Sequence, residues 1–423
     1  MPLSERAGIA PAAAAIGPAA ALGRAGRWPF HLADFRRLWL IGLVVFAVRW
    51  LEMLVVGVFV YQRTDSAFQV ALMTLLRMAP MVMFGPLIGA YVERMERRHA
   101  QVVVSLSMLL TAIAVAVLAY AGQLEVWHLA LAAFCNGIAW AADNPVRRVM
   151  IGEVVGPERM GAAMAIDVGA NNASQMLGPT IGGLVLTAFG ISGAFTISVA
   201  CYALALVAAL RLQHRNAVAP SKTGKVVAHV IEGLLLARRD KRLVAVLVIT
   251  VIYNVFGWPF TSMIPVLGQD SLQLTPSGIG ILASMTGVGS FLGAIGIALW
   301  ARQRHFTMLY VTAVLSYLAL MMGVALSPTA FLAGSALLAT GLANSGFSVM
   351  QATLIYLAAP AEMRSRLYGV LSLCIGSGLV GFLNIGLLAE WVGAPAATVL
   401  SGIEGLVAMA LTWRWWREIG RTT

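Results

Sequence analysis

Long apolar runs, separated by short polar breaks, follow one another along most of the chain. Each run can cross the roughly 30 Å hydrocarbon core of a bilayer, which takes about 20 helical residues. Backbone groups in lipid must find their hydrogen-bond partners within the protein, so each run is expected to be an α-helix. The pattern predicts an all-α membrane protein of about twelve spans, at residues 38–61, 68–91, 102–121, 127–144, 162–189, 193–210, 244–267, 279–300, 308–326, 330–358, 367–391 and 396–413.

Basic residues fall mainly at one end of these predicted spans. With both termini placed in the cytoplasm, nearly all of the 29 lysines and arginines lie on the cytoplasmic side. The exceptions are Arg49 and Arg77 inside spans, and Arg63 in an outer loop. Cytoplasmic loops are rich in Lys and Arg, and a wrong number of spans would scramble this alternation. We therefore expect a multi-pass protein of the cell inner (plasma) membrane with both termini in the cytoplasm.

Composition narrows the possible functions. Hydrophobic residues make up 60% of the chain and charged residues 11%, whereas a soluble domain has about 25% charged residues. The net charge of +11 is the expected result of membrane topology, so no nucleic-acid partner is predicted. Cys135, Cys201 and Cys374 lie inside apolar runs, a placement that predicts neither a disulfide framework nor a metal site.

The 20 methionines raise the alternative of copper transport, because thioethers suit Cu(I). No cluster joins them to a buried Cys and His, and Met also fills gaps between apolar helices. The chain has no phosphate-binding loop of the Gly-x-x-x-x-Gly-Lys-Ser/Thr type and no room for a nucleotide domain. We expect no cofactor and no enzymatic activity, and coupling to a proton gradient replaces ATP as the predicted driving force.

A polar connector divides the chain into two similar parts. The predicted organisation is a disordered cytoplasmic tail, a six-helix half, a cytoplasmic connector with an amphipathic helix at 226–237, a second six-helix half and a short tail. Their bounds are 1–30, 31–212, 213–242, 243–416 and 417–423. We expect the protein to be a monomer in the lipid bilayer.

Short motifs repeat between the halves. Gly85-Pro-Leu-Ile-Gly-Ala90 ends the second predicted span, and Gly289-Ser-Phe-Leu-Gly-Ala294 ends the eighth. Each is followed by a basic cluster and a histidine, His99 or His305. Duplicated six-helix halves are typical of secondary transporters, whose binding site lies between the halves near the membrane midplane.

The loop after the second span reads Gly89-Ala-Tyr-Val-Glu93-Arg94-Met-Glu96-Arg97-Arg98. It resembles the Gly-x-x-x-Asp-Arg-x-Gly-Arg-Arg loop of the major facilitator superfamily, with Glu93 in place of the aspartate and Glu96 in place of the second glycine. Residues 35–39, 143–148, 178–183 and 232–234 resemble the superfamily's branch of bacterial drug and siderophore exporters. The resemblance covers about residues 31–416 and implies two pseudo-symmetric six-helix halves that transport a small molecule by alternating access.

The resemblance also implies a conformational latch and a gating helix. The latch residues would be Gly89, Glu93, Arg94, Arg97, Arg98 and Asp143. In it Glu93 would cap the N-terminus of span eleven, where an acid gains roughly 0.3–1 kcal/mol, and Arg94 or Arg97 would pair with Asp143. The alternative is that these charges only set topology. The gating helix would use Gly178, Pro179, Gly182 and Gly183, although close helix packing also accounts for small residues there.

Arg49 and Glu52 are the most informative charges inside a span. They are three residues apart, so they share a helical face. An arginine at a helix centre costs about 2.5–3.5 kcal/mol to insert and should therefore face the bundle interior. The functional hypothesis is that Glu52 binds and releases a proton while Arg49 adjusts its proton affinity or binds an anionic substrate. The structural alternative is that the two charges neutralise each other.

Other polar residues inside spans are candidate cavity residues. Arg77, three residues before Pro80, lines the cavity or pairs with Glu52 in one interpretation, and links helices structurally in the other. Asn171 and Gln175 share a face of span five, and Asn254 and Asn344 are weaker candidates in spans seven and ten. Glu404 has no assigned role.

The leading hypothesis is proton-coupled efflux of a small amphipathic molecule, either a drug-like compound or a siderophore. An importer or uniporter of a small organic or metal solute remains an alternative. A non-transporting membrane scaffold or sensor is an alternative of another class. Charges inside the membrane count against the scaffold, because idle charges are costly to insert.

Overall fold

The computed structural model describes residues 29–92, 95–214, 240–358 and 364–415, with 235 and 238 described singly. Residues 1–28 of the predicted tail at 1–30, the predicted tail at 417–423 and the amphipathic segment 226–237, apart from residue 235, lie outside this part of the chain, whereas Pro29 and Phe30 begin a short helix. The first half contains η1 (Pro29–His31), α2 (Ala33–Thr64), α3 (Ala67–Val92), α4 (Arg97–Tyr120), α5 (Val126–Val155) and α6 (Met160–Leu210).

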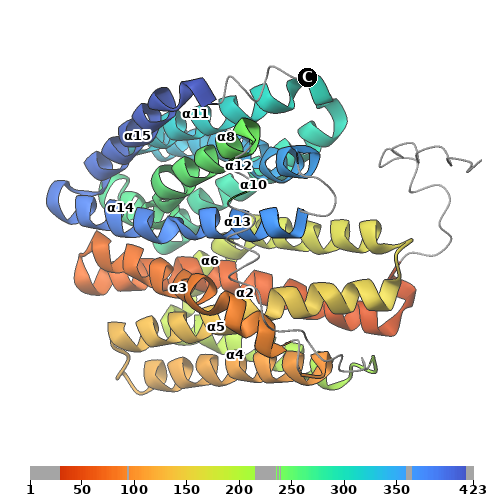
Figure 1. Ribbon diagram of the computed structural model, residues 1–423. Coiled ribbons are helices and arrows are strands. Elements are labelled where there is room, and N and C mark those ends of the chain that lie inside the picture. The colour runs from red at the N-terminus through yellow and green to blue at the C-terminus, as the bar shows by residue number, and fades with distance from the viewer. Residues whose placement is uncertain are drawn as a thin grey trace, which may run out of the picture.

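The second half begins with one span built from five consecutive segments. These are α8 (Lys241–Ile252), η2 (Tyr253–Gly257), η3 (Trp258–Met263), α9 (Ile264–Val266) and η4 (Leu267–Ser271). The remaining elements are α10 (Pro276–Trp300), η5 (Gln303–His305), α11 (Phe306–Ala325), α12 (Ala330–Ala358), α13 (Arg364–Gly376), α14 (Gly378–Val392) and α15 (Ala394–Leu411). Figure 1 shows the two halves as two layers of helices, α2–α6 below and α8–α15 above.

Ten helical stretches of the described residues are long and apolar enough to cross a membrane. One of them, α6, has 51 residues and bends sharply at Gly190, whose φ of 66° is compatible with glycine but strained for other residues. Counting α6 as two crossings and adding the 30-residue α5 gives twelve crossings in the described part of the chain. The prediction of about twelve helices is confirmed.

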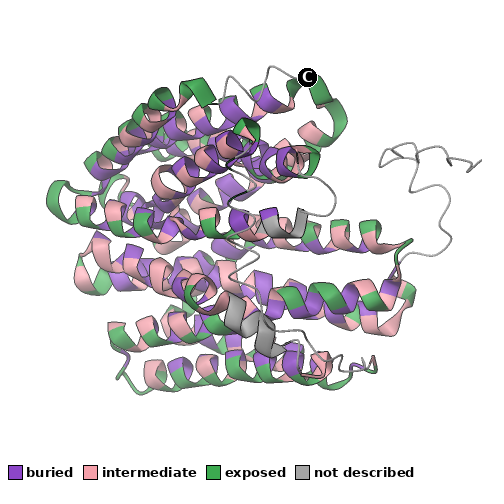
Figure 2. Ribbon diagram, in the orientation of Figure 1, coloured by how far each residue is buried: buried purple, intermediate pink, exposed green. Residues whose placement is uncertain are grey.

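Since the number of crossings is even, α2 begins and α15 ends at the same end of the bundle. We call this the terminus-side end, and the opposite end the far end. Exposed residues cover the outside of the bundle and buried residues line the contacts between helices (Figure 2). The exposed surface carries many large apolar side chains, such as Phe331 and Leu299, as expected for a surface that faces lipid.

One predicted boundary was wrong. The fourth span was expected to end at 144, because the charged residues from Asp143 onward read as a polar break. Instead α5 continues to Val155. One charged residue of this extension, Arg147, turns into the first half and is 0% exposed, whereas Arg148 and Glu153 are exposed. The helix therefore has a buried polar face that a hydropathy pattern treats as a loop.

Candidate functional site

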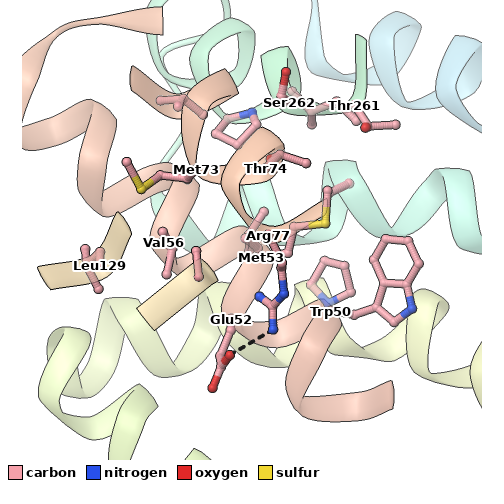
Figure 3. Close-up of a pocket in the computed structure, with 18 of the residues that line it drawn as sticks. Trp50, Glu52, Met53, Val56, Met73, Thr74, Arg77, Leu129, Thr261 and Ser262 are labelled. Atoms are coloured by element: carbon pink, nitrogen blue, oxygen red, sulfur yellow. Dashed lines mark hydrogen bonds and ion pairs between the residues drawn. The ribbon is translucent and has the colours of Figure 1, made fainter. Parts of the chain in front are cut away.

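A cavity of about 80 Å³ lies between the two halves. Its walls come from α2, α3, α5 and α6 on one side and from η3, α9 and α10 on the other. Figure 3 shows Glu52 and Arg77 on the first-half side and Thr261 and Ser262 across from them. Most of the wall is apolar, with Met53, Met73 and Phe195 among the lining residues.

A carboxylate and two side chains that bind it line the first-half side of this cavity. The Arg77 guanidinium lies 3.1 Å from Glu52, in an ion pair between α3 and α2 (Figure 3). Asn136 of α5 donates a second hydrogen bond to the same carboxylate oxygen, at 3.3 Å. Glu52 is 2% exposed, so the charge is compensated by these two partners in place of bulk water.

A glycine next to Asn136 makes this geometry possible. A Cβ at Gly137 would collide with the backbone carbonyl of Arg77 and lie 3.0 Å from Pro80. Only a residue without a side chain lets α5 approach α3 this closely. The close approach brings Asn136 and Arg77 to the same carboxylate from two different helices.

Arg49 does not form an ion pair with Glu52, so the structural alternative, in which these two charges neutralise each other, was wrong. The Arg49 guanidinium lies over the ring of Trp140 on α5, 4.0 Å from the ring centroid, and 5.7 Å from the centroid of Trp50. An arginine over an indole face is attracted by the ring quadrupole. Arg77, the alternative partner named from the sequence, holds Glu52 instead.

The other polar candidates separate into two groups. Gln175 lines the cavity, whereas Asn171, one turn earlier on α6, is not among its lining residues. Asn254 donates to the carbonyl of Thr250, one turn back along its own span, at 2.8 Å. Asn344 accepts from the Tyr253 hydroxyl at 2.7 Å and donates to Ser290 at 3.1 Å. Asn254 and Asn344 therefore belong to hydrogen bonds inside the second half, and neither lines this cavity.

The latch residues are only partly described. Glu93 and Arg94 lie outside the described residues, and Gly89 lies within α3, where only its backbone is described. Of the two arginines expected to pair with Asp143, Arg94 is one of the residues not described, and Arg97 forms an ion pair with Glu153 in this conformation. Arg98 donates to the carbonyl of Leu210, where α6 ends, at 2.9 Å.

Asp143 belongs instead to a buried charge cluster inside the first half. It lies 3.2 Å from Arg147 and accepts from Gln101 at 2.7 Å. Arg147 also pairs with Asp167 of α6. These four side chains, which we call the buried charge cluster, join α4, α5 and α6. Sequence reasoning had counted Arg147 among the topology charges at the membrane surface, and its complete burial corrects that interpretation.

The predicted gating glycines are points of close helix contact. A Cβ at Gly178 would lie 2.7 Å from the Cβ of Trp50, and one at Gly182 would lie 2.9 Å from the carbonyl of Leu51. Both glycines therefore face α2. Gly183 faces the other half, where its Cα lies in close contact with Gly280 of α10. Pro179 lines the cavity, and its carbonyl is directly against Gly280.

Contacts between α6 and α10 follow a seven-residue spacing that ends partway along the bundle. Gly183 meets Gly280, and seven residues further toward the terminus-side end Met176 meets Gly287. The next position on that face of α6 is Gly169, where an added Cβ would meet no atom within 4 Å. Residues seven apart lie on nearly the same helix face, so the two helices touch in the far half and separate toward the terminus-side end.

Side-chain bonds between the halves also gather near the far end. The Tyr61 hydroxyl donates to Asp270, and Ser66 donates to Glu390 at 2.9 Å. Thr180 donates to Ser284 at 2.8 Å. These bonds close the bundle at the far end. Together with the α6–α10 separation, they give a conformation that opens toward the terminus-side end.

Sequence reasoning missed Asn136, Thr261 and Ser262. Asn136 is a single polar residue in an apolar run, so its partner is invisible without the packing of α3. Thr261 and Ser262 lie in a span whose regular helix is interrupted by Pro259 and Pro265. Proline removes backbone donors, and interrupted membrane helices at transporter midplanes often line binding sites. The two prolines were the sequence signal for this region.

The geometry is that of two helical halves around a central, partly polar cavity, and the sequence comparison identifies the family. Residues 38–383 match the sequence model of the Major Facilitator Superfamily. The chain belongs to the major facilitator superfamily. It is therefore a multi-pass membrane transporter of a small-molecule substrate, and not an enzyme.

Efflux proteins are among the relatives of this major facilitator protein. It is 26% identical to the multidrug efflux pump Tap of Mycolicibacterium fortuitum over 396 residues, covering 88% of this chain and 91% of Tap. It is 21% identical to macrolide efflux protein A of Streptococcus pyogenes over 351 residues, covering 81% of this chain and 85% of that protein. These relatives fit the exporter branch to which the sequence motifs are similar.

Solved structures confirm the fold. A POT family transporter in complex with a thioalcohol-conjugated peptide superposes with a TM-score of 0.74 at 13% identity, covering 92% of this chain and 96% of that chain. A bacterial homolog of the human lysosomal transporter Spinster, in an inward-facing and unoccupied conformation, superposes with a TM-score of 0.70 at 15% identity, covering 93% and 98%. At such identities the likeness concerns the fold alone.

Proposed function

We propose that this protein exports small amphipathic molecules across the cell inner (plasma) membrane in exchange for protons, by alternating access. The observation that carries the proposal is the Glu52–Arg77 ion pair. Glu52 is the acidic residue, and Arg77 the basic residue, among the described side chains that line the cavity between the halves. A carboxylate buried there, with one cationic partner, is placed to exchange a proton with whichever side of the membrane the cavity faces.

The proposed cycle uses the ion pair as a switch. Protonation of Glu52 removes its charge and frees the Arg77 guanidinium from its partner at 3.1 Å. Loss of the proton restores the pair. A substrate that competes with the proton for this site leaves when Glu52 is protonated, which couples outward movement of substrate to inward movement of protons. Asn136 keeps the carboxylate in place in both states, because its amide can donate to Glu52 or accept from it.

The orientation of the bundle in the membrane decides which side of the membrane the cavity faces. The excess of Lys and Arg supports a cytoplasmic location for the terminus-side end, which holds both ends of the bundle. The conformation described above, open toward that end, is then the inward-facing state that takes up substrate from the cytoplasm. At about 80 Å³ the cavity is smaller than the roughly 300–1,000 Å³ of drug-sized sites, so we expect the halves to separate further as substrate enters.

The apolar wall supports an amphipathic substrate. Met53 and Met73 are flexible side chains that adapt to different shapes, and Gln175 offers a donor and an acceptor. Arg49 lies on Trp140 outside the lining residues, and we propose that it binds an anionic group of substrates that reach deeper toward the terminus-side end. The names of the relatives, a multidrug pump and a macrolide efflux protein, support drug-like compounds over siderophores.

The test is transport by purified protein in liposomes with an imposed pH gradient, using erythromycin and ethidium as probes. Proton exchange predicts uptake that depends on the gradient, and Glu52→Gln is expected to lower it at least about tenfold while folding is retained. Glu404→Gln makes the same chemical change at an intramembrane acid that is not among the cavity-lining residues, and is expected to transport normally. Wild-type rates in Glu52→Gln, or no gradient-driven movement of either probe by the unmodified protein, would contradict the proposal.

A further inference from the structure

A second hollow lies on the second half and shares no lining residue with the central cavity. It is a groove of about 730 Å³ whose walls are α10 and α11, both packed against α12. Gly293 and Gly296 line it from α10, and Met308 and Thr312 line it from α11. At its terminus-side end lie Trp300 and His305.

The groove is apolar along most of its length. Small residues on α10 and α12 leave its floor open, and a Cβ at Gly296 would meet only the Trp300 ring, at 3.6 Å. Trp300 is 77% exposed at the end of its helix, a position where tryptophan commonly marks the membrane–water interface. An apolar groove that runs from this interface into the membrane is suited to hold a lipid acyl chain.

Positive charge gathers where the groove meets the interface. Arg302 and Arg304 are exposed, and Arg304 donates to His305 at 3.1 Å. Within the described residues neither arginine forms an ion pair with a carboxylate. The equivalent loop of the first half differs, because Glu93 and Glu96 lie among its arginines and His99 pairs with Glu96 at 3.1 Å. The second-half loop, Ala301-Arg-Gln-Arg-His305, contains no acidic residue.

We propose that this groove binds one anionic diacyl phospholipid, with an acyl chain between α10 and α11 and its phosphate held by Arg302 and Arg304. Basic pockets between membrane helices on the cytoplasmic side recognise anionic headgroups in this way. A second copy of the chain fits less well. A two-fold axis along the membrane normal would bring the Arg302 and Arg304 clusters of both copies together, and like charges in contact are unfavourable.

Native mass spectrometry of the delipidated full-length protein tests the proposal, with phosphatidylglycerol and phosphatidylcholine of identical acyl chains as probes. The unmodified protein is expected to bind a first phosphatidylglycerol at least about tenfold more tightly than phosphatidylcholine, given two arginines at the headgroup. The Arg302→Gln/Arg304→Gln variant is expected to lose this preference. Arg211→Gln/Arg414→Gln removes the same charge from exposed positions at the terminus-side end and is expected to keep it.

The acyl chain is tested separately by filling the groove. Gly296→Leu is expected to lower binding of the first phosphatidylglycerol at least about tenfold, since Gly296 lines the groove and a side chain there would fill part of it, with its Cβ meeting only the Trp300 ring. Gly323→Leu places the same side chain at an exposed position of α11 with open space around it, and is expected to bind normally. Three results would overturn the proposal: equal affinity of the unmodified protein for both lipids, unchanged binding in Gly296→Leu, or a dimer that Gly296→Leu disrupts.

Discussion

The two halves of this transporter repeat the same fold but hold their buried polar groups differently. Among the described residues, every buried charged side chain lies in the first half: Glu52, Asp143, Arg147 and Asp167. Buried polar groups of the second half are neutral. Tyr253 bonds Asn344 and stacks on Phe347, and Gln351 donates to Thr250 at 2.9 Å. The two halves thus share one architecture, but the first half buries charged side chains and the second half buries neutral groups joined by hydrogen bonds.

This difference assigns different physical properties to the halves. A buried ion pair responds strongly to one proton, because loss of one charge leaves the other without compensation at low dielectric. A neutral hydrogen bond does not respond to pH in the same way. We therefore expect proton-dependent changes to begin in the first half, while the second half acts as the more constant surface against which the first half moves.

The largest expected effect comes from opening the buried charge cluster. Arg147→Met leaves Asp143 and Asp167 buried near each other without the arginine that bonds both, and we expect a loss of about 3–5 kcal/mol in stability. Gln351→Leu, at a neutral buried site of the second half, is expected to lose only about 0.5–1.5 kcal/mol. Thermal unfolding of both variants in detergent measures the difference, and equal losses would remove the contrast between the halves.

A smaller effect is expected at the contact between the halves. Gly280→Val would press a side chain against the carbonyl of Pro179, and overpacking of this kind costs about 1–3 kcal/mol. Separation of the halves at the far end relieves it. On a background without the native cysteines, Thr180→Cys should then react faster with a water-soluble maleimide. Gly323→Val is the lipid-facing control, and slower labelling in Gly280→Val would show that the contact does not hold the far end closed.

The apolar pattern of the sequence was sufficient to predict the fold, since membrane spans depend mainly on length and hydropathy. The site was harder to predict. Helical spacing put Arg49 and Glu52 on one face, but it contains no information about the helix opposite. Arg77, on the next helix, binds Glu52, and Gly137 lets α5 approach α3 so that Asn136 reaches the same carboxylate. Arg147 was misplaced for a related reason, because a hydropathy pattern cannot distinguish a solvated charge from one paired inside the protein.

Tyr253→Phe tests how much one buried neutral hydrogen bond contributes to the stability of the second half. It removes the hydroxyl that donates to Asn344 at 2.7 Å but keeps the ring stacked on Phe347. We expect a loss of about 0.5–1.5 kcal/mol, measured as a lower melting temperature. Tyr120→Phe, at a hydroxyl bonded to Thr196 on the exposed surface of the first half, should change little. A larger loss of stability in Tyr120→Phe than in Tyr253→Phe would mean that burial does not determine how much each hydroxyl contributes.

Glu404 should show the smallest effect, although it also lies inside a span. It accepts from Asn384 at 2.9 Å, across α14 and α15, and a glutamine oxygen can accept the same bond. Glu404→Gln is therefore expected to change stability by less than about 0.5 kcal/mol. If its melting temperature falls as far as that of Arg147→Met, then a charge in the second half contributes as much to stability as the buried charges of the first half, and the contrast between the halves is wrong.

The Glu52–Arg77 pair has a consequence for biogenesis. Its members belong to the first two spans, which only Asp65 and Ser66 separate, so both charges emerge from the ribosome within one helical hairpin. Each alone would oppose partitioning into lipid, whereas a hairpin that enters as a unit carries no net charge at that depth. We expect Glu52→Leu, which leaves Arg77 alone, to lower the inserted fraction of α3 in a glycosylation-mapping assay. The pair that is proposed to sense protons would then also let the nascent chain enter the membrane.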